Sequence, residues 1–158
     1  MSQLRLAFIG GGNMAGAIFG GLLWGGWPSE SITVVEPLDE QRQRIAAARP
    51  GVKLLAQADA SLRDADMVVW AVKPQSFAEA AAACTPHVSQ ALQLSVMAGV
   101  RCDAIARATG SQRVVRAMPN TPALIGKGIS GLFARDAASA DDRAAVERVL
   151  APTGNLLW

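Results

Sequence analysis

The chain has 158 residues, a length typical of one compact domain with a hydrophobic core. Hydrophobic residues make up 51% of it and charged residues 18%, a composition that excludes intrinsic disorder. The net charge is +2, and the only lysines are Lys53, Lys73 and Lys127, so the sequence lacks the basic stripe that nucleic-acid binding needs. We therefore expect an apolar globular domain without a nucleic-acid partner.

The cysteines and the single histidine bear on metal and redox chemistry. Cys84 and Cys102 have neither Cys-x-x-Cys nor metal-site spacing, and His87 has no second histidine to act with. The sequence thus predicts no metal site, and it favours a reducing, cytoplasmic location in which both thiols stay free. We interpret His87, which follows Pro86 in an expected helix, as a surface residue.

The uncharged stretch over residues 6–27 raises the question of a membrane helix. Gly12, Gly16 and Gly20 even repeat the small-residue spacing of packed membrane helices. Residues 10–12 argue against this interpretation, because all three are glycines and each costs about 1 kcal/mol of helix propensity relative to alanine. We divide the stretch into a strand and a helix and expect no membrane partner.

Short apolar runs alternate along the chain with segments of helical periodicity. Strands are expected at residues 4–9, 32–35, 52–55, 67–72, 92–97, 113–118, 128–134 and 155–158. Helices are expected at residues 14–24, 39–48, 76–84, 103–108 and, capped by Ser139, up to residue 150. Strands that are apolar throughout are typical of parallel sheets covered on both faces. The expected fold class is α/β, with residues 1–158 forming one doubly wound, mostly parallel sheet of the Rossmann type.

The first expected strand runs into a glycine motif. Gly10, Gly12 and Ala15 satisfy G-x-G-x-x-G/A between a strand and a helix, the context in which this motif binds a dinucleotide. Gly10 permits the tight turn, Gly12 lets a pyrophosphate approach the backbone, and Ala15 allows close packing of helix on strand. The helix N-terminus then offers free N–H groups to the phosphates. A glycine-rich turn without a ligand is the alternative.

Glu36 follows the second expected strand and lies 24 residues beyond Gly12, near the spacing of about 20 at which an acidic residue receives the adenosine ribose. A carboxylate at this place repels a 2′-phosphate and so favours NADH over NADPH. Arg42 and Arg44 on the next helix are candidates for contacting such a phosphate instead. A solvated glutamate at a strand end is the other interpretation.

Three further segments follow expected strands, at the edge where open parallel sheets bind ligands. They are Ala71, Val72, Lys73 and Pro74; Val96, Met97 and Ala98; and Met118, Pro119, Asn120 and Thr121. Prolines restrict the first and the third segment, and the third holds an amide and a hydroxyl in one arrangement. Surface, core and turn roles are the alternatives for the three segments.

Several motifs, in this order along the chain, resemble those of one enzyme family. They are FIGGGNM at residues 8–14, VKPQ at 72–75, AGV at 98–100 and VRAMPNTPA at 115–123. Together they resemble pyrroline-5-carboxylate reductase over nearly the full chain. The resemblance implies an oxidoreductase of proline biosynthesis that reduces 1-pyrroline-5-carboxylate to L-proline by hydride transfer from NADPH or NADH.

The resemblance also implies roles for single residues. The pyrophosphate would lie on Ile9, Gly10, Gly11, Gly12, Asn13 and Met14. Residues 71–74 and 96–98 would line the nicotinamide side, and residues 118–121 would form the floor of the reaction site. No acid or base is assigned, because a protonated cyclic imine is already electrophilic and has mainly to be positioned.

Family members continue into a helical dimerisation domain that binds the substrate carboxylate and makes them homo-oligomers, and we expect this domain to lie outside residues 1–158. Part of the apolar surface, near Trp158, is expected to meet that domain. Two alternative functions remain open. One is a non-catalytic dinucleotide-binding regulatory module, and the other is a related imine or hydroxyacid reductase.

Overall fold

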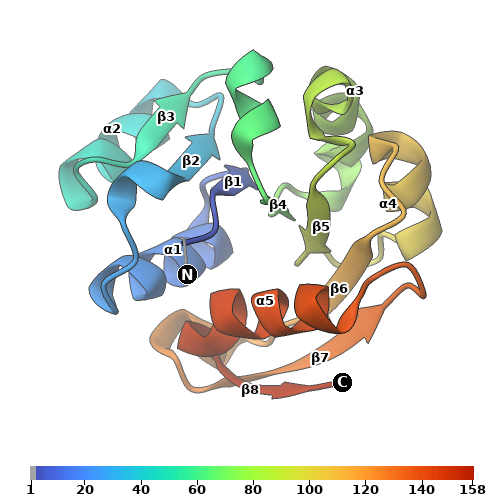
Figure 1. Ribbon diagram of the computed structural model, residues 1–158. Helices are drawn as coiled ribbons and strands as arrows, with labels where there is room; N and C mark the ends of the chain where they lie inside the picture. The colour runs from blue at the N-terminus through green and yellow to red at the C-terminus, as the bar shows by residue number, and fades with distance from the viewer. Residues whose placement is uncertain (1–2) are drawn as a thin grey trace.

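Eight strands form one sheet in the order β3-β2-β1-β4-β5-β6-β7-β8 in the computed structural model, which describes residues 3–158 (Figure 1). Their bounds are β1 Leu6–Ile9, β2 Ile32–Val35, β3 Lys53–Leu55, β4 Met67–Trp70, β5 Leu92–Ser95, β6 Val114–Met118, β7 Gly128–Ala134 and β8 Gly154–Leu157. Neighbouring strands are parallel except β6 and β7, which are antiparallel. The strand order reverses direction between β1 and β4, so the expected doubly wound α/β fold is confirmed.

Helices cover both faces of the sheet. The longer ones are α1 Asn13–Trp24, α2 Asp39–Ala48, α3 Phe77–Val88, α4 Cys102–Thr109 and α5 Ala140–Leu150. Short 3-10 turns are η1 Ser29–Ser31, η2 Ala60–Asp64, η3 Pro74–Ser76, η4 Thr121–Ile125 and η5 Ala151–Thr153. Apolar residues of α1, α2 and α5 form one core with the sheet, and those of α3, α4 and η2 form a second core on the opposite face.

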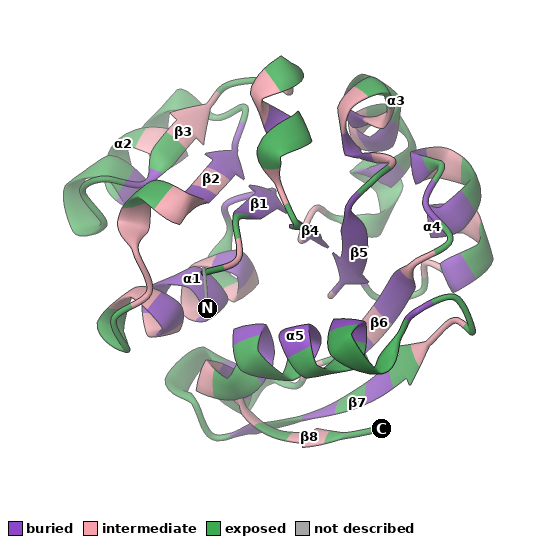
Figure 2. Cartoon of the chain, viewed as in Figure 1, coloured by how far each residue is buried: buried purple, intermediate pink, exposed green. Residues whose placement is uncertain are grey.

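The central strands supply both cores at once, because successive side chains of a strand point to opposite faces. In β1, Phe8 faces the α1 core and contacts Phe19 edge to face at 5.4 Å between ring centroids. In β4, Trp70 faces the α3 core and donates a hydrogen bond of 2.7 Å to the buried Gln93 side chain. Figure 2 shows these strands buried along their length. Two-sided burial accounts for much of the high apolar content.

Residues 6–27 divide into β1 and α1, as the three glycines predict. Helix α1 has 12 residues, which span about 18 Å and fall short of the roughly 30 Å apolar layer of a bilayer. Within residues 3–158, no helix has the length and apolar character that crossing a membrane requires.

Several element bounds differ from the expected ones. The expected strands 67–72 and 92–97 end at Trp70 and Ser95, so the residues beyond them lie in loops at the carboxyl edge. The expected helix 76–84 continues to Val88 as α3, because Cys84 and Val88 lie one turn apart on its buried face. Pro86 lies inside the last turn, where its missing N–H leaves the carbonyl oxygen four residues earlier without its usual helical donor.

His87 was expected on the surface, and the structure places it there, partly exposed in the last turn of α3. Its Nδ1 atom is buried and has no hydrogen-bond partner among residues 3–158. One side of the ring is therefore packed against the protein.

Strand β7 alternates strictly between buried and exposed residues. Its buried residues face α5, whereas Ile129 and Phe133 are exposed on the opposite face together with Met118 of β6 and Leu157 of β8. We call these four residues the outer β6–β8 face. An apolar surface was expected near Trp158, and its ring is 45% exposed, with the Arg143 guanidinium of α5 at 5.3 Å from the ring centroid. The exposed apolar surface at this end of the chain therefore includes Trp158 and the face of the sheet that α5 leaves uncovered.

Candidate functional site

The loop between β1 and α1 contains three glycines with different structural needs. Gly10 has φ +100°, and a Cβ atom there would lie 2.7 Å from the carbonyl oxygen of Ala71. At Gly11 a Cβ atom would lie 2.8 Å from the Cδ1 atom of Ile45. At Gly12, by contrast, φ is −81° and a Cβ atom would meet nothing within 4 Å. The fold therefore requires a glycine at position 10 and leaves open space at position 12.

The N–H groups of this loop are only partly used by the protein. The Gly10 N–H donates to Val35 O over 2.9 Å, and the Gly11 N–H donates to the Glu36 carboxylate over 3.0 Å. Helix α1 begins after Gly12 without a side-chain cap and without an acidic residue in its first turn. The first N–H groups of the helix thus remain available, together with the positive end of the helix dipole. Free N–H groups beside an open glycine fit a phosphate group.

Glu36 lies beside this loop, at the carboxyl end of β2. It is buried, and its two carboxylate oxygens accept hydrogen bonds from the N–H groups of Gly11 at 3.0 Å and Leu38 at 2.9 Å. The interpretation as a solvated glutamate is therefore wrong. Because each carboxylate oxygen has two lone pairs, both retain capacity to accept a hydroxyl donor.

The two arginines of α2 that were candidates for a phosphate contact already have partners. The Arg42 guanidinium donates to the carbonyl oxygens of Glu36 at 2.8 Å and Pro37 at 2.9 Å, and it pairs with Asp39 at 3.1 Å. Arg44 pairs with Glu40 at 2.7 Å on the exposed side of α2. Neither arginine presents a free guanidinium beside the glycine loop.

A cavity of about 350 Å³ lies at the carboxyl edge, where the glycine loop faces the ends of β5 and β6. Its lining residues are Asn13, Met14, Val96, Met97, Ala98, Ala117, Met118, Pro119, Asn120, Thr121 and Leu124. All of them were expected at the site except Ala117 and Leu124. In the sequence, Ala117 is indistinguishable from other residues of its strand. Leu124 lies in η4, and no sequence pattern predicts that η4 folds back over the loop. The lining contains no charged side chain.

The remaining expected site residues lie outside this cavity. Ile9 is buried at the end of β1. Ala71 and Val72 lie behind the glycine loop, 2.7 and 3.1 Å from where a Cβ atom of Gly10 would be. Lys73 is exposed and precedes η3, which begins at Pro74. The structure thus places Ala71 and Val72 against the loop, and all four residues of the 71–74 segment lie outside the cavity lining.

The loop after β6 is held by hydrogen bonds in addition to its prolines. The Ile129 N–H donates to the Asn120 Oδ1 atom over 3.0 Å, which ties the loop to β7. The Ala123 N–H donates to Asn120 O, and the Lys127 N–H donates to Pro122 O, each over 3.0 Å. Asn120 and its neighbours are therefore presented to the cavity in a fixed arrangement.

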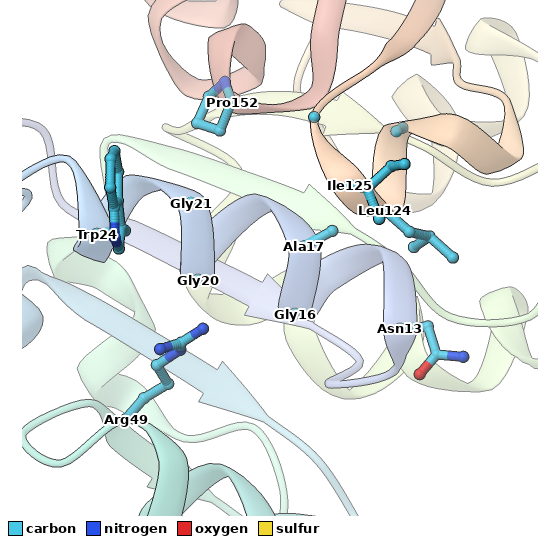
Figure 3. A pocket seen from close by; sticks show the side chains of 12 residues that line it. Asn13, Gly16, Ala17, Gly20, Gly21, Trp24, Arg49, Leu124, Ile125 and Pro152 are labelled. Atoms are coloured by element: carbon cyan, nitrogen blue, oxygen red, sulfur yellow. The ribbon is translucent and has the colours of Figure 1, made fainter.

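A second hollow of about 550 Å³ runs along α1 and adjoins the cavity at Asn13 and Leu124 (Figure 3). Its floor is made of glycine and alanine residues of α1, and the Trp24 ring stands at its far end, 91% exposed. Arg49 points toward this helix from the end of α2. The hollow extends the cavity as a groove along α1, with Trp24 and Arg49 among its lining residues.

The titratable groups offer no nucleophile to the cavity. Burial raises the pKa of the Cys84 thiol to about 11, and burial is also the main cause of the raised pKa of Cys102. Neither thiol lines the cavity. Among residues 3–158, no group of three histidine, cysteine or carboxylate side chains is placed to hold a metal ion. The site therefore offers backbone N–H groups, amides and apolar surface.

Comparison with known proteins identifies relatives over the whole chain. The family described as NADP oxidoreductase coenzyme F420-dependent matches residues 5–99. A pyrroline-5-carboxylate reductase of Pseudomonas aeruginosa is 40% identical over 160 residues, which cover 100% of this chain and 58% of the relative. The enzyme of the same name from Haemophilus influenzae is 39% identical over 163 residues, with the same coverage of 100% and 58%. The chain thus spans less than two thirds of the length of these relatives.

Solved structures agree with the sequence relatives. A pyrroline-5-carboxylate reductase structure from Coxiella burnetii superposes with a TM-score of 0.91 at 30% identity, covering 99% of this chain and 59% of that one. A Plasmodium falciparum pyrroline carboxylate reductase with NADP bound superposes with a TM-score of 0.82 at 23% identity, covering 99% and 57%. The second likeness is one of fold.

Proposed function

The chain belongs to the family described as NADP oxidoreductase coenzyme F420-dependent, and from that premise we propose that it binds a nicotinamide dinucleotide at the carboxyl edge of its sheet. We propose further that it does so within an enzyme that reduces 1-pyrroline-5-carboxylate to L-proline. Relatives of that name match the chain from end to end. Because the chain covers 58% of their length, we interpret it as their dinucleotide-binding part.

The glycine loop carries this proposal. Gly12 has space where a Cβ atom would be, and it stands at a helix N-terminus that no side chain caps. A glycine that the fold does not require is accounted for by a ligand that approaches the backbone closely. Gly12, Asn13 and Met14 would hold the pyrophosphate there, and Glu36 would receive the hydroxyls of the adenosine ribose.

The neutral cavity suits the second half of the cofactor. A bound reduced nicotinamide supplies the hydride that reduces a C=N bond. The residues of the chain have to hold a flat ring, bring the imine carbon against it and exclude water. Val96, Met97 and Met118 offer apolar surface for this, and Asn120 and Thr121 offer polar contacts. A cation for the substrate carboxylate is absent from the lining, and we propose that the further length of the relatives supplies it.

NADH is the cofactor that the ribose end favours. The buried Glu36 carboxylate occupies the place where a 2′-phosphate would bring a second negative charge. Arg42 and Arg44 are engaged with other partners and do not offset that charge. We therefore propose that the chain prefers NADH, although the Plasmodium falciparum structure holds NADP.

Calorimetric titration of the chain with NADH and with NADPH tests the binding proposal. We expect saturable binding of one equivalent, with NADH bound about tenfold more tightly, a difference of about 1.4 kcal/mol. The absence of saturable binding by either cofactor would overturn the proposed function. Tighter binding of NADPH would overturn the preference alone.

A chimera tests the reaction. The chain is fused to the carboxyl-terminal part of the Pseudomonas aeruginosa relative, and loss of NADH absorbance is followed with 1-pyrroline-5-carboxylate as substrate. Turnover supports the reductase proposal. A chimera that binds NADH and an unreactive analogue of 1-pyrroline-5-carboxylate but reduces nothing would favour a regulatory module. A chimera that reduces only other imines or hydroxyacids would favour a related reductase.

The outer β6–β8 face is a candidate surface for contact with another protein chain. Its four exposed apolar residues, Met118, Ile129, Phe133 and Leu157, make a surface of the kind that protein contacts cover. We propose that the homo-oligomers expected for this family form with the further length of the relatives, and that this face contributes to the contact. A cytoplasmic location is proposed on the two free buried thiols.

A further inference from the structure

Asn120 lines the cavity, and one end of its side-chain amide is tied to β7. The Ile129 N–H donates to one atom of that amide over 3.0 Å, and only the carbonyl oxygen of an amide accepts a hydrogen bond. The bond therefore fixes the orientation of the side chain, with Oδ1 toward β7. Because the amide is planar, Nδ2 lies on the edge away from that strand.

Asn120 is exposed, and its Nδ2 group faces solvent without an acceptor within residues 3–158. Asn120 lines the cavity between Pro119 and Thr121, in a loop that two prolines stiffen. Its orientation is also favoured by Gly128, since a Cβ atom there would lie 2.8 Å from the Asn120 Oδ1 atom. The chain thus holds one N–H donor pair at the cavity wall at little further cost in conformational entropy.

The lining of the cavity indicates which acceptor this donor meets. Val96, Met97 and Met118 form an apolar surface, and no lining residue carries a charge. A carboxylate placed there without a cation would lose hydration that nothing replaces. A neutral carbonyl oxygen on a flat ring fits both the apolar wall and the single donor.

We propose that Asn120 orients the cofactor by donating a hydrogen bond from Nδ2 to the carboxamide oxygen of the nicotinamide. This inference rests on the proposed function, and it gives Asn120 a defined role within the loop. The hydrogen bond would fix the rotation of the ring about its glycosidic bond, and hence the ring face that a substrate meets. Thr121 has no comparable tether to another element.

The variant Asn120→Asp isolates the donor. It keeps an oxygen for the Ile129 N–H and replaces Nδ2 by a second acceptor, whereas Asn120→Ala removes both groups. Asn155→Asp is the matched control, because Asn155 is exposed on β8 opposite Ile129, lies outside the cavity lining and undergoes the same change of charge. Melting temperatures of the three variants report folding, and calorimetry reports binding.

The expected results separate the role of the donor from a structural role. Asn120→Asp melts close to the wild type, binds NADH about tenfold more weakly, and binds ADP-ribose, which lacks the nicotinamide, within about twofold of the wild type. Asn120→Ala melts at a lower temperature and loses NADH affinity as well. Asn155→Asp matches the wild type for both ligands.

A ligand-side comparison covers the case in which Asn120→Asp folds poorly. A dinucleotide whose carboxamide is replaced by hydrogen should bind the wild type about tenfold more weakly than its parent. Equal affinity of the wild type for the two dinucleotides, unchanged NADH affinity of Asn120→Asp, or equal weakening of NADH and ADP-ribose would each overturn the inference. Failure of the wild type to bind either NADH or ADP-ribose would instead refute the proposed function, and the inference with it.

Discussion

Polar groups are paired with one another at the amino edge of the sheet, whereas several at its carboxyl edge lack partners within the protein. At the amino edge, the Arg113 guanidinium donates to both oxygens of Asp142, at 3.0 and 2.7 Å, and the Arg5 N–H donates to Asp66 at 2.8 Å. At the carboxyl edge, the first N–H groups of α1 and the Asn120 Nδ2 group are left without partners within residues 3–158. Paired groups hold a fold together, and unpaired groups of fixed geometry are those on which a ligand can bind.

The charge and the volume of the two hollows alone would have favoured the amino edge as the ligand site. A hollow of about 1010 Å³ lies at the amino edge and is lined by several arginines and aspartates. The cavity at the carboxyl edge is smaller, about 350 Å³, and its lining is neutral. The difference teaches that in this protein charged side chains mainly serve the fold, whereas backbone N–H groups and amides form the candidate site.

The largest effect is expected where the fold and the site share a residue. Gly10→Ala should lower the free energy of unfolding by about 3 kcal/mol or more, because φ is +100° and the new Cβ atom would lie 2.7 Å from a backbone oxygen. Urea denaturation measures this change. A loss below about 1 kcal/mol would show that the loop relaxes easily and that its geometry is not imposed by the fold.

Gly12→Ala should have the opposite profile. Its φ of −81° suits alanine and the space is open, so stability should be unchanged or slightly higher. Dinucleotide binding should weaken by about 2 kcal/mol, roughly 30-fold, because the methyl group occupies the space of the pyrophosphate. Calorimetry with NADH measures the loss, and unaltered affinity would contradict the proposed use of this glycine.

Asp142→Asn tests the paired edge. The Arg113 guanidinium lowers the pKa of the Asp142 carboxyl, and the Ser139 N–H adds to this effect. The variant should lose about 1.5 kcal/mol of stability at pH 7 and keep its NADH affinity. Asp141→Asn is the control, because Asp141 is an exposed neighbour that forms no ion pair within residues 3–158.

The pH dependence of that effect follows from the sign of the shift. Because the folded pKa of Asp142 is depressed, the pair contributes fully above the ordinary carboxyl pKa of about 4 and is lost as the pH falls through the lowered value. The stability difference between wild type and Asp142→Asn should therefore shrink below about pH 4. A difference that stays constant down to pH 2 would contradict the ion-pair account.

The smallest expected effect concerns cofactor choice. Glu36→Gln keeps a carbonyl oxygen for one N–H group and removes the charge, so the preference for NADH over NADPH should fall by about 1 kcal/mol. Glu40→Gln removes a carboxylate from the exposed side of α2 and should leave the preference as it is. An unchanged preference in Glu36→Gln would show that the selectivity has another origin.

The glycine motif and the order of strands made much of this arrangement predictable. Local patterns are enough to place Gly10, Glu36 and the loop after β6 at one edge, since each follows a parallel strand. The antiparallel pairing of β7 was not predictable, because it depends on η4 returning the chain beside β6. The hydrogen bond between the Ile129 N–H and Asn120 was not predictable either, because it depends on where β7 pairs with β6 in the folded sheet.

The orientation of side chains at the surface was the other feature that the sequence did not predict. Trp158 is 45% exposed, and its indole N–H donates to Glu147 of α5 over 2.6 Å. His87 is partly exposed in the last turn of α3, with its Nδ1 atom buried. Hydrophobic periodicity indicates which elements form, and it does not report such side-chain contacts.

The central claim is that the carboxyl edge with its uncharged cavity, and not the amino edge with its larger charged hollow, binds a dinucleotide. A titration of the ¹⁵N-labelled chain with NADH, followed by amide chemical shifts, tests it directly. The account predicts saturable shifts at Gly12, Asn13, Met14 and Ala98 and at the Asn120 side-chain amide, with none at Asp66, Arg113 or Asp142. Shifts confined to the amino edge, or no saturable shift anywhere, would contradict it.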